Sequence, residues 1–374
     1  MDQLAATVRE ILEAPGNLHV TPVSQEESAT VFEKVKNFKS VYPEKQANLE
    51  RGIEAYFEEH RVKPEDLARK ERVRDELQKF AIQIFPRCVM VTGGSTATHL
   101  ATVESDLDVC LFVAEVDGRY AQDRDFTDKI LSRFYDALLI RVPPFMDVAQ
   151  FIARARVPIV KLSCNKEYGE VKVDITCNKL DTMRTNHLIY HYVRFDDRVA
   201  KLNLVVKRWA TKLGILNSFD GLLSSFSFTM MVIHFLQSVC TPPIVPNLDK
   251  LFPSAFERSH VWTLHHNECI DMAIKKRMPE NGLSVAELFL GFIAYYASFP
   301  WDDMGIDVRH GKRHERNYSL EDEAEFIVIE EPYERYNSAR TVCSEYDEYA
   351  ISQSIKAVAR NIFEKGSLEP EVLF

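Results

Sequence analysis

Three aspartates that follow a glycine–serine turn are the residues of this 374-residue chain best suited to chemistry. Asp106 and Asp108 lie eleven residues after Gly94-Ser95, and Asp174 lies in a later strand-like segment. Residues i and i+2 of a strand share a face about 6.6 Å apart, a span that can bracket two metal ions about 3.5–4 Å apart. Backbone N–H groups at such a turn can hold phosphate oxygens. The pattern predicts a site for two Mg²⁺ ions and a nucleoside triphosphate, and therefore nucleotidyl transfer.

The elements that must carry these aspartates read as half-buried strands. Apolar and polar residues alternate over 106–113 and 171–176, so one face of each strand is apolar and the other carries the carboxylates. A helix is expected over 96–103, directly after Ser95. The competing interpretation is that each aspartate is an ordinary solvated residue. If the Asp-x-Asp pair stood alone, this competing interpretation would be favoured. The turn with Gly93 and Gly94 favours the site, because it supplies phosphate contacts that carboxylates cannot.

Several segments resemble one known family. The Gly-Ser turn, Asp-x-Asp and later Asp are similar to the nucleotidyltransferase fold of the DNA polymerase β superfamily. The more specific likeness, over about residues 70–365, is to template-independent RNA terminal nucleotidyltransferases, which include cytoplasmic poly(A) polymerases and terminal uridylyltransferases. Five segments carry it: ARVPIVK at 155–161, VKRWA at 206–210, LSSFS at 223–227, PPIVPNL at 242–248 and EPYE at 331–334.

This resemblance implies an α+β fold. It combines a polymerase-β-like nucleotidyltransferase domain, a mixed sheet with helices, and a mainly helical central domain of the poly(A)-polymerase-associated type, with the nucleotide in a cleft between them. We predict the catalytic domain at 72–185 and a discontinuous helical domain formed by 1–71 and 186–374. Strands are expected at 88–91, 107–113, 157–162 and 171–176, helices at 4–14, 24–42, 46–60, 72–84, 202–213 and 226–239, and a loop or β excursion at 302–317.

The resemblance also implies which residues bind the triphosphate and the base. Ser95 with Gly94, Lys207 and Ser225 would hold phosphates, and Phe226 would stack on the base, although it also fits the apolar core of a helix. A second family lysine is replaced by Thr211, with Lys212 beside it.

Other positions depart from the family pattern. His99 stands where relatives usually have glycine, so the loop over the phosphates is expected to differ in shape. Asn178 and Asn186 are alternative ribose contacts. Glu331, Glu334 and Asn337 are implied in base recognition, and asparagine rather than histidine at 337 favours ATP or relaxed nucleotide choice.

Composition fits such an enzyme without requiring it. No apolar run of 18 residues and no signal-peptide pattern occur, so we expect a soluble, cytoplasmic protein, with a ribonucleoprotein granule or the nucleus as alternatives. Seven cysteines without a Cys-x-x-Cys motif indicate neither disulfides nor zinc. The net charge of −10 is local, because 320–348 holds ten acidic and two basic residues, a balance of −8. Basic clusters elsewhere could bind RNA phosphates.

The predicted reaction is two-metal transfer of a nucleotide to an RNA 3′-hydroxyl, with release of pyrophosphate. Asp106, Asp108 and Asp174 would hold Mg²⁺, or Mn²⁺ in its place. Because no RNA-recognition module is visible, a protein adaptor is expected to choose the RNA. The alternatives are a poly(U) or mixed-nucleotide tailing enzyme, a transferase that modifies a small molecule or protein, and an inactive scaffold.

Overall fold

The computed structural model describes residues 20–21, 23–115, 118–256, 270, 272–316, 326–334 and 336–368. The chain divides into two compact units. The sheet unit is residues 60–190, and the helical unit is the described part of residues 20–59 and 191–368. The predicted boundaries at 72 and 185 stay a prediction, but the helix before the sheet begins at Pro64, so residues 64–71 belong with the sheet unit.

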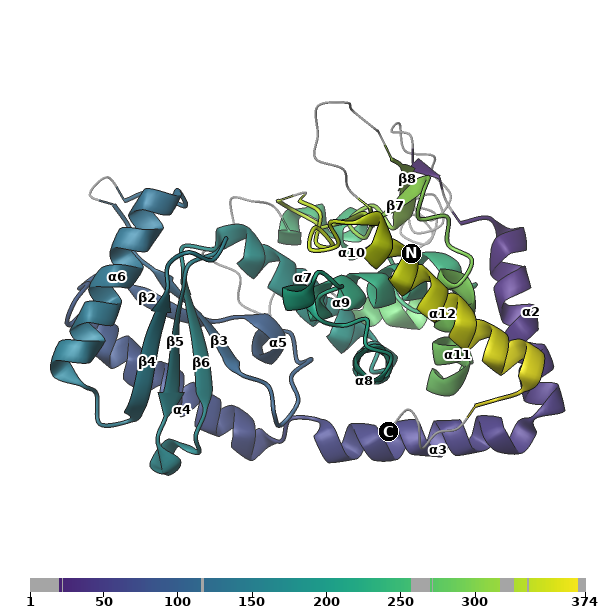
Figure 1. The fold of residues 1–374 in the computed structure, drawn as a ribbon, viewed down its shortest axis with the longest axis horizontal. Helices are drawn as coiled ribbons and strands as arrows, with labels where there is room; N and C mark the ends of the chain where they lie inside the picture. Colours follow the sequence, from purple (N-terminus) through teal and green to yellow (C-terminus); the bar gives the residue numbers. More distant parts are fainter. Residues whose placement is uncertain are drawn as a thin grey trace. The chain divides into compact units, whose positions relative to one another are not determined.

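The sheet unit is built on five strands in the order β2-β3-β6-β5-β4 (Figure 1). Strands β3 and β6 are parallel, whereas the other neighbours are antiparallel. The strands are β2 (Val89–Thr92), β3 (Leu107–Phe112), β4 (Met146–Ile152), β5 (Ile159–Cys164) and β6 (Lys172–Cys177). The helices are α4 (Pro64–Ile82), α5 (Gly94–Ala97), α6 (Arg124–Arg141) and the first part of α7 (Leu180–Phe195).

One face of this sheet forms the core of the unit. Leu107, Val109 and Leu111 of β3 are buried together with apolar side chains of α4 and α6. Phe80 of α4 meets Phe134 of α6 edge to face, with ring centroids 5.8 Å apart. Because successive strand residues point to opposite faces, burying this set places Asp108 and Asp174 on the other face. The predicted alternation of burial is confirmed in β6, whereas β3 alternates only as far as Asp108 and is buried on both faces from Val109 onwards.

The helical unit packs its helices around one very apolar helix, α11, whose residues are all buried apart from polar Glu287. Tyr295, Tyr296, Phe299 and Trp301 form a continuous aromatic cluster at its end. The helices are α2 (Gln25–Val41), α3 (Pro43–His60), the end of α7, α8 (Arg198–Lys212), α9 (Ser225–His234), α10 (Leu248–Leu251), α11 (Val285–Tyr296) and α12 (Glu345–Lys365). A small sheet has the order β1-β8-β7-β9, with β1 (Val20–Thr21), β7 (Met304–Asp307), β8 (Lys312–Glu315) and β9 (Ile329–Glu330).

Several predicted elements agree with the structure and some do not. The four predicted strands exist within two residues of their expected ends, and 302–317 contains the β7–β8 hairpin. Strand β4 was not predicted. The predicted helix over 96–103 is wrong, because α5 is one turn and His99 adopts a left-handed conformation with φ of 60°, which ends a helix. The predicted helix at 4–14 lies outside the described residues.

The α+β class and the polymerase-β-like architecture are confirmed: a mixed sheet carries the aspartates and a separate helical unit follows. Among the described residues, no helix is both long enough and apolar enough to cross a membrane.

Candidate active site

Two of the predicted aspartates are direct neighbours across the parallel pair of strands. Asp108 of β3 stands opposite Asp174 of β6 in the strand register. The pKa of Asp108 is raised to about 6, first by burial and then by the charges of Asp174 and Asp106, whereas Lys70 and Lys161 oppose the shift. The raised pKa follows from like charges held close together in a partly dehydrated place. The sheet therefore concentrates negative charge at one point.

Asp106 completes this group from the residue directly before β3, where it is exposed. Within the described ranges, no three His, Cys, Asp or Glu side chains are gathered tightly enough to hold a metal ion. One reason is visible at Asp174, whose carboxylate is already engaged by a lysine. The three carboxylates share one region but are not arranged as a finished metal cage.

That lysine is Lys161 of β5, which lies opposite Asp174 on the next strand. Its Nζ atom is 2.9 Å from one carboxylate oxygen of Asp174 and 2.7 Å from the other. The segment around Lys161 carries part of the family resemblance, but no role for the lysine could be read from it; the strand register supplies one. Lys161 is a counter-ion that neutralises Asp174 when no other cation does.

A second lysine approaches the aspartates from α4. Lys70 is only 4% exposed, its Nζ atom is 3.4 Å from the Thr96 hydroxyl, and the charges of Asp108 and Asp106 act on it. Burial lowers its pKa, against the opposing effect of these carboxylates. In the sequence, Lys70 is one of several basic residues close together, with Arg72 and Arg74. Its position on the buried side of an amphipathic helix was the signal that could have found it.

The glycine–serine turn lies directly against Asp108. The backbone N–H of Gly93 donates to the Asp108 carbonyl oxygen over 2.8 Å. Gly94 has φ of +56°, and a Cβ atom there would lie 1.9 Å from Asp108 Oδ2. Only glycine fits this position, because any other residue would meet both the left-handed backbone and the carboxylate. Ser95 follows as the second residue of the single-turn helix α5.

Asn186, one of the two expected ribose contacts, lies beside this turn. A Cβ atom on Gly93 would be 3.4 Å from Asn186 Nδ2. The side chain is 6% exposed, and Nδ2 has no hydrogen-bond partner among the described residues. An amide donor left open beside the turn fits the predicted role.

His99 shows how the loop accommodates a departure from the family glycine. Its φ of 60° is one that glycine adopts freely and that histidine tolerates better than most residues. The ring meets Tyr190 edge to face, with centroids 5.0 Å apart. The left-handed turn therefore persists without glycine, and an aromatic contact helps to fix it.

Two observations indicate that the three aspartates are suitable ligands for a divalent metal ion. The donors are hard carboxylate oxygens, the ligand type that Mg²⁺ and Mn²⁺ take. Burial and the charges of Asp174 and Asp106 raise the pKa of Asp108, and a bound cation would offset both effects on its carboxylate.

The remaining predicted residues belong to the helical unit, and the most distinctive is Lys207 on α8. Burial lowers the pKa of Lys207, and no described carboxylate pairs with it. Thr211 donates its hydroxyl to the Lys207 carbonyl oxygen over 2.8 Å, and Lys212 is exposed. A partly buried ammonium without an anion is a suitable place for phosphate. Thr211 is a less suitable place for phosphate, because its hydroxyl already donates to the Lys207 carbonyl oxygen.

Ser225 and Phe226 begin α9, and their neighbours explain why these two are available. The Ser224 hydroxyl caps the helix by accepting from the Ser227 backbone N–H, and the Ser227 hydroxyl donates to the Ser338 carbonyl oxygen. The Ser225 hydroxyl forms no hydrogen bond with any described residue. The half-buried Phe226 ring likewise makes no ring contact in the described part of the chain. Ser224 and Ser227 therefore stabilise the fold, whereas the side chains of Ser225 and Phe226 are available to a ligand.

Asn178, the other expected ribose contact, is engaged by the backbone. It is completely buried, accepts from the Val113 N–H and donates to the carbonyl oxygens of Val113 and Ala121. Its amide therefore joins the end of β3 to the following loop. The residue has a structural role because no donor is left for a ribose.

Asn337, which is expected to take part in base choice, is engaged by the backbone of its own turn. Its Oδ1 atom accepts from the N–H groups of Ile329 and Ala339, and its Nδ2 atom donates to the Ile327 carbonyl oxygen. The side chain is 7% exposed. Asn337 thus fastens its own turn. Glu331 also stabilises this turn, because its carboxylate accepts hydrogen bonds from the backbone N–H groups of Tyr333 and Glu334.

Comparison with known proteins gives two matches to family models. Residues 49–194 match the central palm domain of the mitochondrial-like poly(A) RNA polymerases. Residues 284–337 match the Cid1 family of poly(A) polymerases. The first match contains the aspartates and the second contains the turn held by Asn337.

Curated relatives agree with these models. The chain is 33% identical to the poly(A) RNA polymerase GLD2 of Mus musculus over 304 residues, which is 80% of this chain and 61% of the relative. It is 32% identical to GLD2 of Homo sapiens over the same length and with the same coverage. The chain therefore spans about three fifths of the length of these relatives.

Solved structures share the architecture. A GLD-2/RNP-8 complex aligns with a TM-score of 0.73 at 28% identity, covering 88% of this chain and 98% of that one. The poly(U) polymerase Cid1 with MgGTP bound aligns with a TM-score of 0.68 at 25% identity, with the same two coverages.

Proposed function

We propose that this chain, which belongs to the family of template-independent RNA terminal nucleotidyltransferases, adds nucleotides from a nucleoside triphosphate to RNA 3′-hydroxyl groups. The observation that carries the proposal is the pairing of Asp108 with Asp174 across two parallel strands, directly against the turn at Gly94. Carboxylates and a phosphate-binding turn in contact are the two components that nucleotidyl transfer needs.

Asp106, Asp108 and Asp174 would hold divalent metal ions. When bound, such ions supply positive charge to the reacting phosphate and lower the pKa of the RNA hydroxyl. The N–H groups and hydroxyl at Ser95 orient phosphate oxygens, and Asn186 offers its open amide to the ribose. Lys207 and Ser225 contribute an unpaired cation and a free hydroxyl for the triphosphate, and Phe226 offers a ring for the base.

We propose ATP as the preferred nucleotide. Since Asn337 is committed to its own turn, the preference no longer rests on that residue. The proposed preference for ATP is supported by the 32–33% sequence identity to relatives that are named poly(A) RNA polymerases. Base selection would then come from groups around Phe226, whose ring makes no ring contact in the described part of the chain.

We further propose that a separate protein directs the enzyme to its RNA in the cytoplasm. The solved relative in a GLD-2/RNP-8 complex supports a partner for enzymes of this type. Mg²⁺ is the proposed metal, with support from the MgGTP complex of Cid1.

The test is extension of a 5′-labelled oligo(A) by the purified protein with each nucleoside triphosphate in turn, in Mg²⁺, in Mn²⁺ and in EDTA. We expect longer products with ATP, none in EDTA, and a loss of at least about 10³-fold for Asp108→Asn, because several kcal/mol of charge stabilisation disappear. An oligonucleotide that ends in a 3′-deoxy residue is the matched control.

A variant Asp108→Asn that extends RNA at the wild-type rate would overturn the assignment of the site. Consumption of ATP that is independent of RNA and of the 3′-hydroxyl would point instead to nucleotidyl transfer onto a small molecule or protein.

A further inference from the structure

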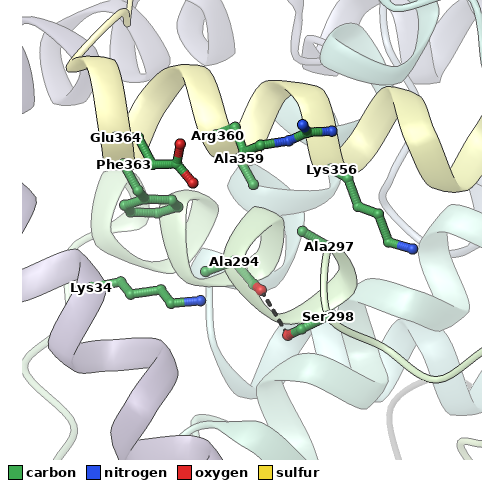
Figure 2. Close-up of a pocket in the computed structure, with 9 residues that line it drawn as sticks. All are labelled: Lys34, Ala294, Ala297, Ser298, Lys356, Ala359, Arg360, Phe363 and Glu364. Atoms are coloured by element: carbon green, nitrogen blue, oxygen red, sulfur yellow. Dashed lines mark hydrogen bonds between the residues drawn. The ribbon is translucent and has the colours of Figure 1, made fainter.

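Helices α2, α11 and α12 of the helical unit lie against one another (Figure 1). Residues of all three line a groove with a mainly apolar floor. Its volume is about 460 Å³. Figure 2 shows Ala294 and Ala297 from the end of α11 facing Ala359 and Phe363 of α12. Three alanines leave the space that larger residues would fill. The groove is large enough for a few side chains of another molecule.

The rim of this groove is cationic. Lys34 of α2 and Lys356 and Arg360 of α12 line it, against a single carboxylate, Glu364 (Figure 2). None of the three cations forms an ion pair or hydrogen bond with another described residue. Lys39, one helical turn further along α2, does pair with Glu287 over 2.9 Å. Three unpaired cations around one apolar groove stand out in a chain whose net charge is −10.

These cations are not needed to satisfy the end of α11. Positive side chains often interact with the last carbonyl groups of a helix. Here the chain does this itself, because the Ser298 hydroxyl bonds to the carbonyl oxygens of Ala294 and Tyr295 and the Ala297 N–H bonds to Ile293. The positive charge at the rim is therefore available to something outside the unit.

We propose that this groove docks an acidic, amphipathic segment of a partner protein. An apolar side chain of that segment lies over Ala294, Ala297 and Ala359, and flanking carboxylates meet Lys34, Lys356 and Arg360. Helical segments bind in grooves of this kind through apolar side chains one turn apart, and charge complementarity sets the partner and speeds the encounter. The site lies outside the proposed catalytic residues and does not depend on the reaction.

RNA fits the same groove less well. Single-stranded RNA binds where aromatic rings are free to stack on bases. The aromatic side chain here, Phe363, is held edge to face against Phe38, with centroids 6.2 Å apart. Because the floor is made of alanines, it offers bases neither a ring nor a hydrogen bond.

The experiment measures fluorescence anisotropy of a labelled synthetic helical peptide, with leucines at i and i+4 and glutamates around them, on the full chain. A peptide with glutamine in place of glutamate is the control probe, and labelled oligo(A) is measured in parallel. The double variant Lys34→Glu/Arg360→Glu is compared with Lys36→Glu/Lys365→Glu, which reverses two exposed charges on the same two helices outside the groove. Ala359→Trp fills the floor without changing any charge.

We expect the dissociation constant of the acidic peptide to rise roughly tenfold or more in Lys34→Glu/Arg360→Glu and in Ala359→Trp, and to stay within about twofold in the control pair. Oligo(A) binding should be unchanged in all of them. Equal losses in both double variants would mean non-specific attraction and would overturn the proposal, as would absence of peptide binding. A loss confined to oligo(A) would make the groove an RNA surface instead. If Ala359→Trp fails to fold, the charge pair still decides.

Discussion

The carboxylate group of the sheet unit and the phosphate-binding candidates of the helical unit differ in how their charges are balanced. Asp174 is paired with Lys161, and Lys70 is buried near Asp108 and Asp106, so the negative charge has counter-ions within the unit. Lys207 has no described anion, and the hydroxyl of Ser225 has no described acceptor. The carboxylates of the sheet unit have lysine counter-ions that a metal ion could replace. The ammonium and the hydroxyl of the helical unit have no described partner and could bind an anion. Four predictions test this difference.

The largest effect is expected from Gly94→Ala, which should destabilise the protein by about 3–4 kcal/mol. The Cβ atom would add overlap with Asp108 Oδ2 to the strain of a left-handed backbone. Urea unfolding measures the change. Gly214→Ala is the matched control, because its φ is +73° but nothing lies within 4 Å of the added atom, so it should cost only about 1–2 kcal/mol. Equal losses would show that the turn does not press on Asp108.

The next effect concerns pH in metal-free buffer. The pKa of Asp108 in the folded protein is about 6, above the ordinary value of 3.8, so folding favours the protonated acid. The resulting destabilisation is absent below about pH 4, grows between pH 4 and 6 and is complete above 6. Asp108→Asn removes it, and should therefore be as stable as wild type at pH 4 and up to about 3 kcal/mol more stable at pH 8. A constant difference across this range would contradict the crowding of carboxylates.

For the open region, Lys207→Met should raise the KM for the triphosphate by roughly tenfold or more. A charge-assisted hydrogen bond to phosphate is worth about 1.5–3 kcal/mol. The control is Lys212→Met, since Lys212 is exposed on the same helix and should leave KM within about twofold. Steady-state kinetics with oligo(A) measure both. If Lys212→Met has the larger effect, the phosphate contact is displaced along the helix.

The smallest effect is expected from Lys161→Met, which should lower the unfolding free energy in EDTA by about 1 kcal/mol or less. The pair with Asp174 is partly exposed and its attraction is screened. The same variant should gain more thermal stability than wild type when Mg²⁺ is added, because a competing cation is gone. Differential scanning fluorimetry with a Mg²⁺ titration measures this, and Lys161→Arg should behave like wild type. A smaller gain than in wild type would mean that Lys161 helps to hold the metal.

Sequence reasoning was sufficient where a local rule applied. The alternation of apolar residues placed Asp108 and Asp174 on one face of two strands, whereas the roles of Lys207, Ser225 and Phe226 come from the resemblance and stay predictions. Sequence reasoning could not foresee the backbone contacts of Asn178 and Asn337, because an asparagine in a family segment looks the same whether its amide faces a ligand or its own backbone. It also overlooked strand β4 and the role of Lys70, since neither stands out from the chain around it.

The sequence by itself determined which carboxylates exist, their spacing after a glycine–serine turn, and the family that they resemble. Those features are local, because strand periodicity and turn residues act over a few positions. Only the tertiary structure decided which polar groups are already used. Strand register pairs Lys161 with Asp174, and burial places Lys70 near Asp108. The side chains of Asn178 and Asn337 form hydrogen bonds with the backbone. The Asn186 amide nitrogen and the Ser225 hydroxyl have no described hydrogen-bond partner. Such pairing depends on residues far apart in the chain, so it follows from packing and not from any local pattern.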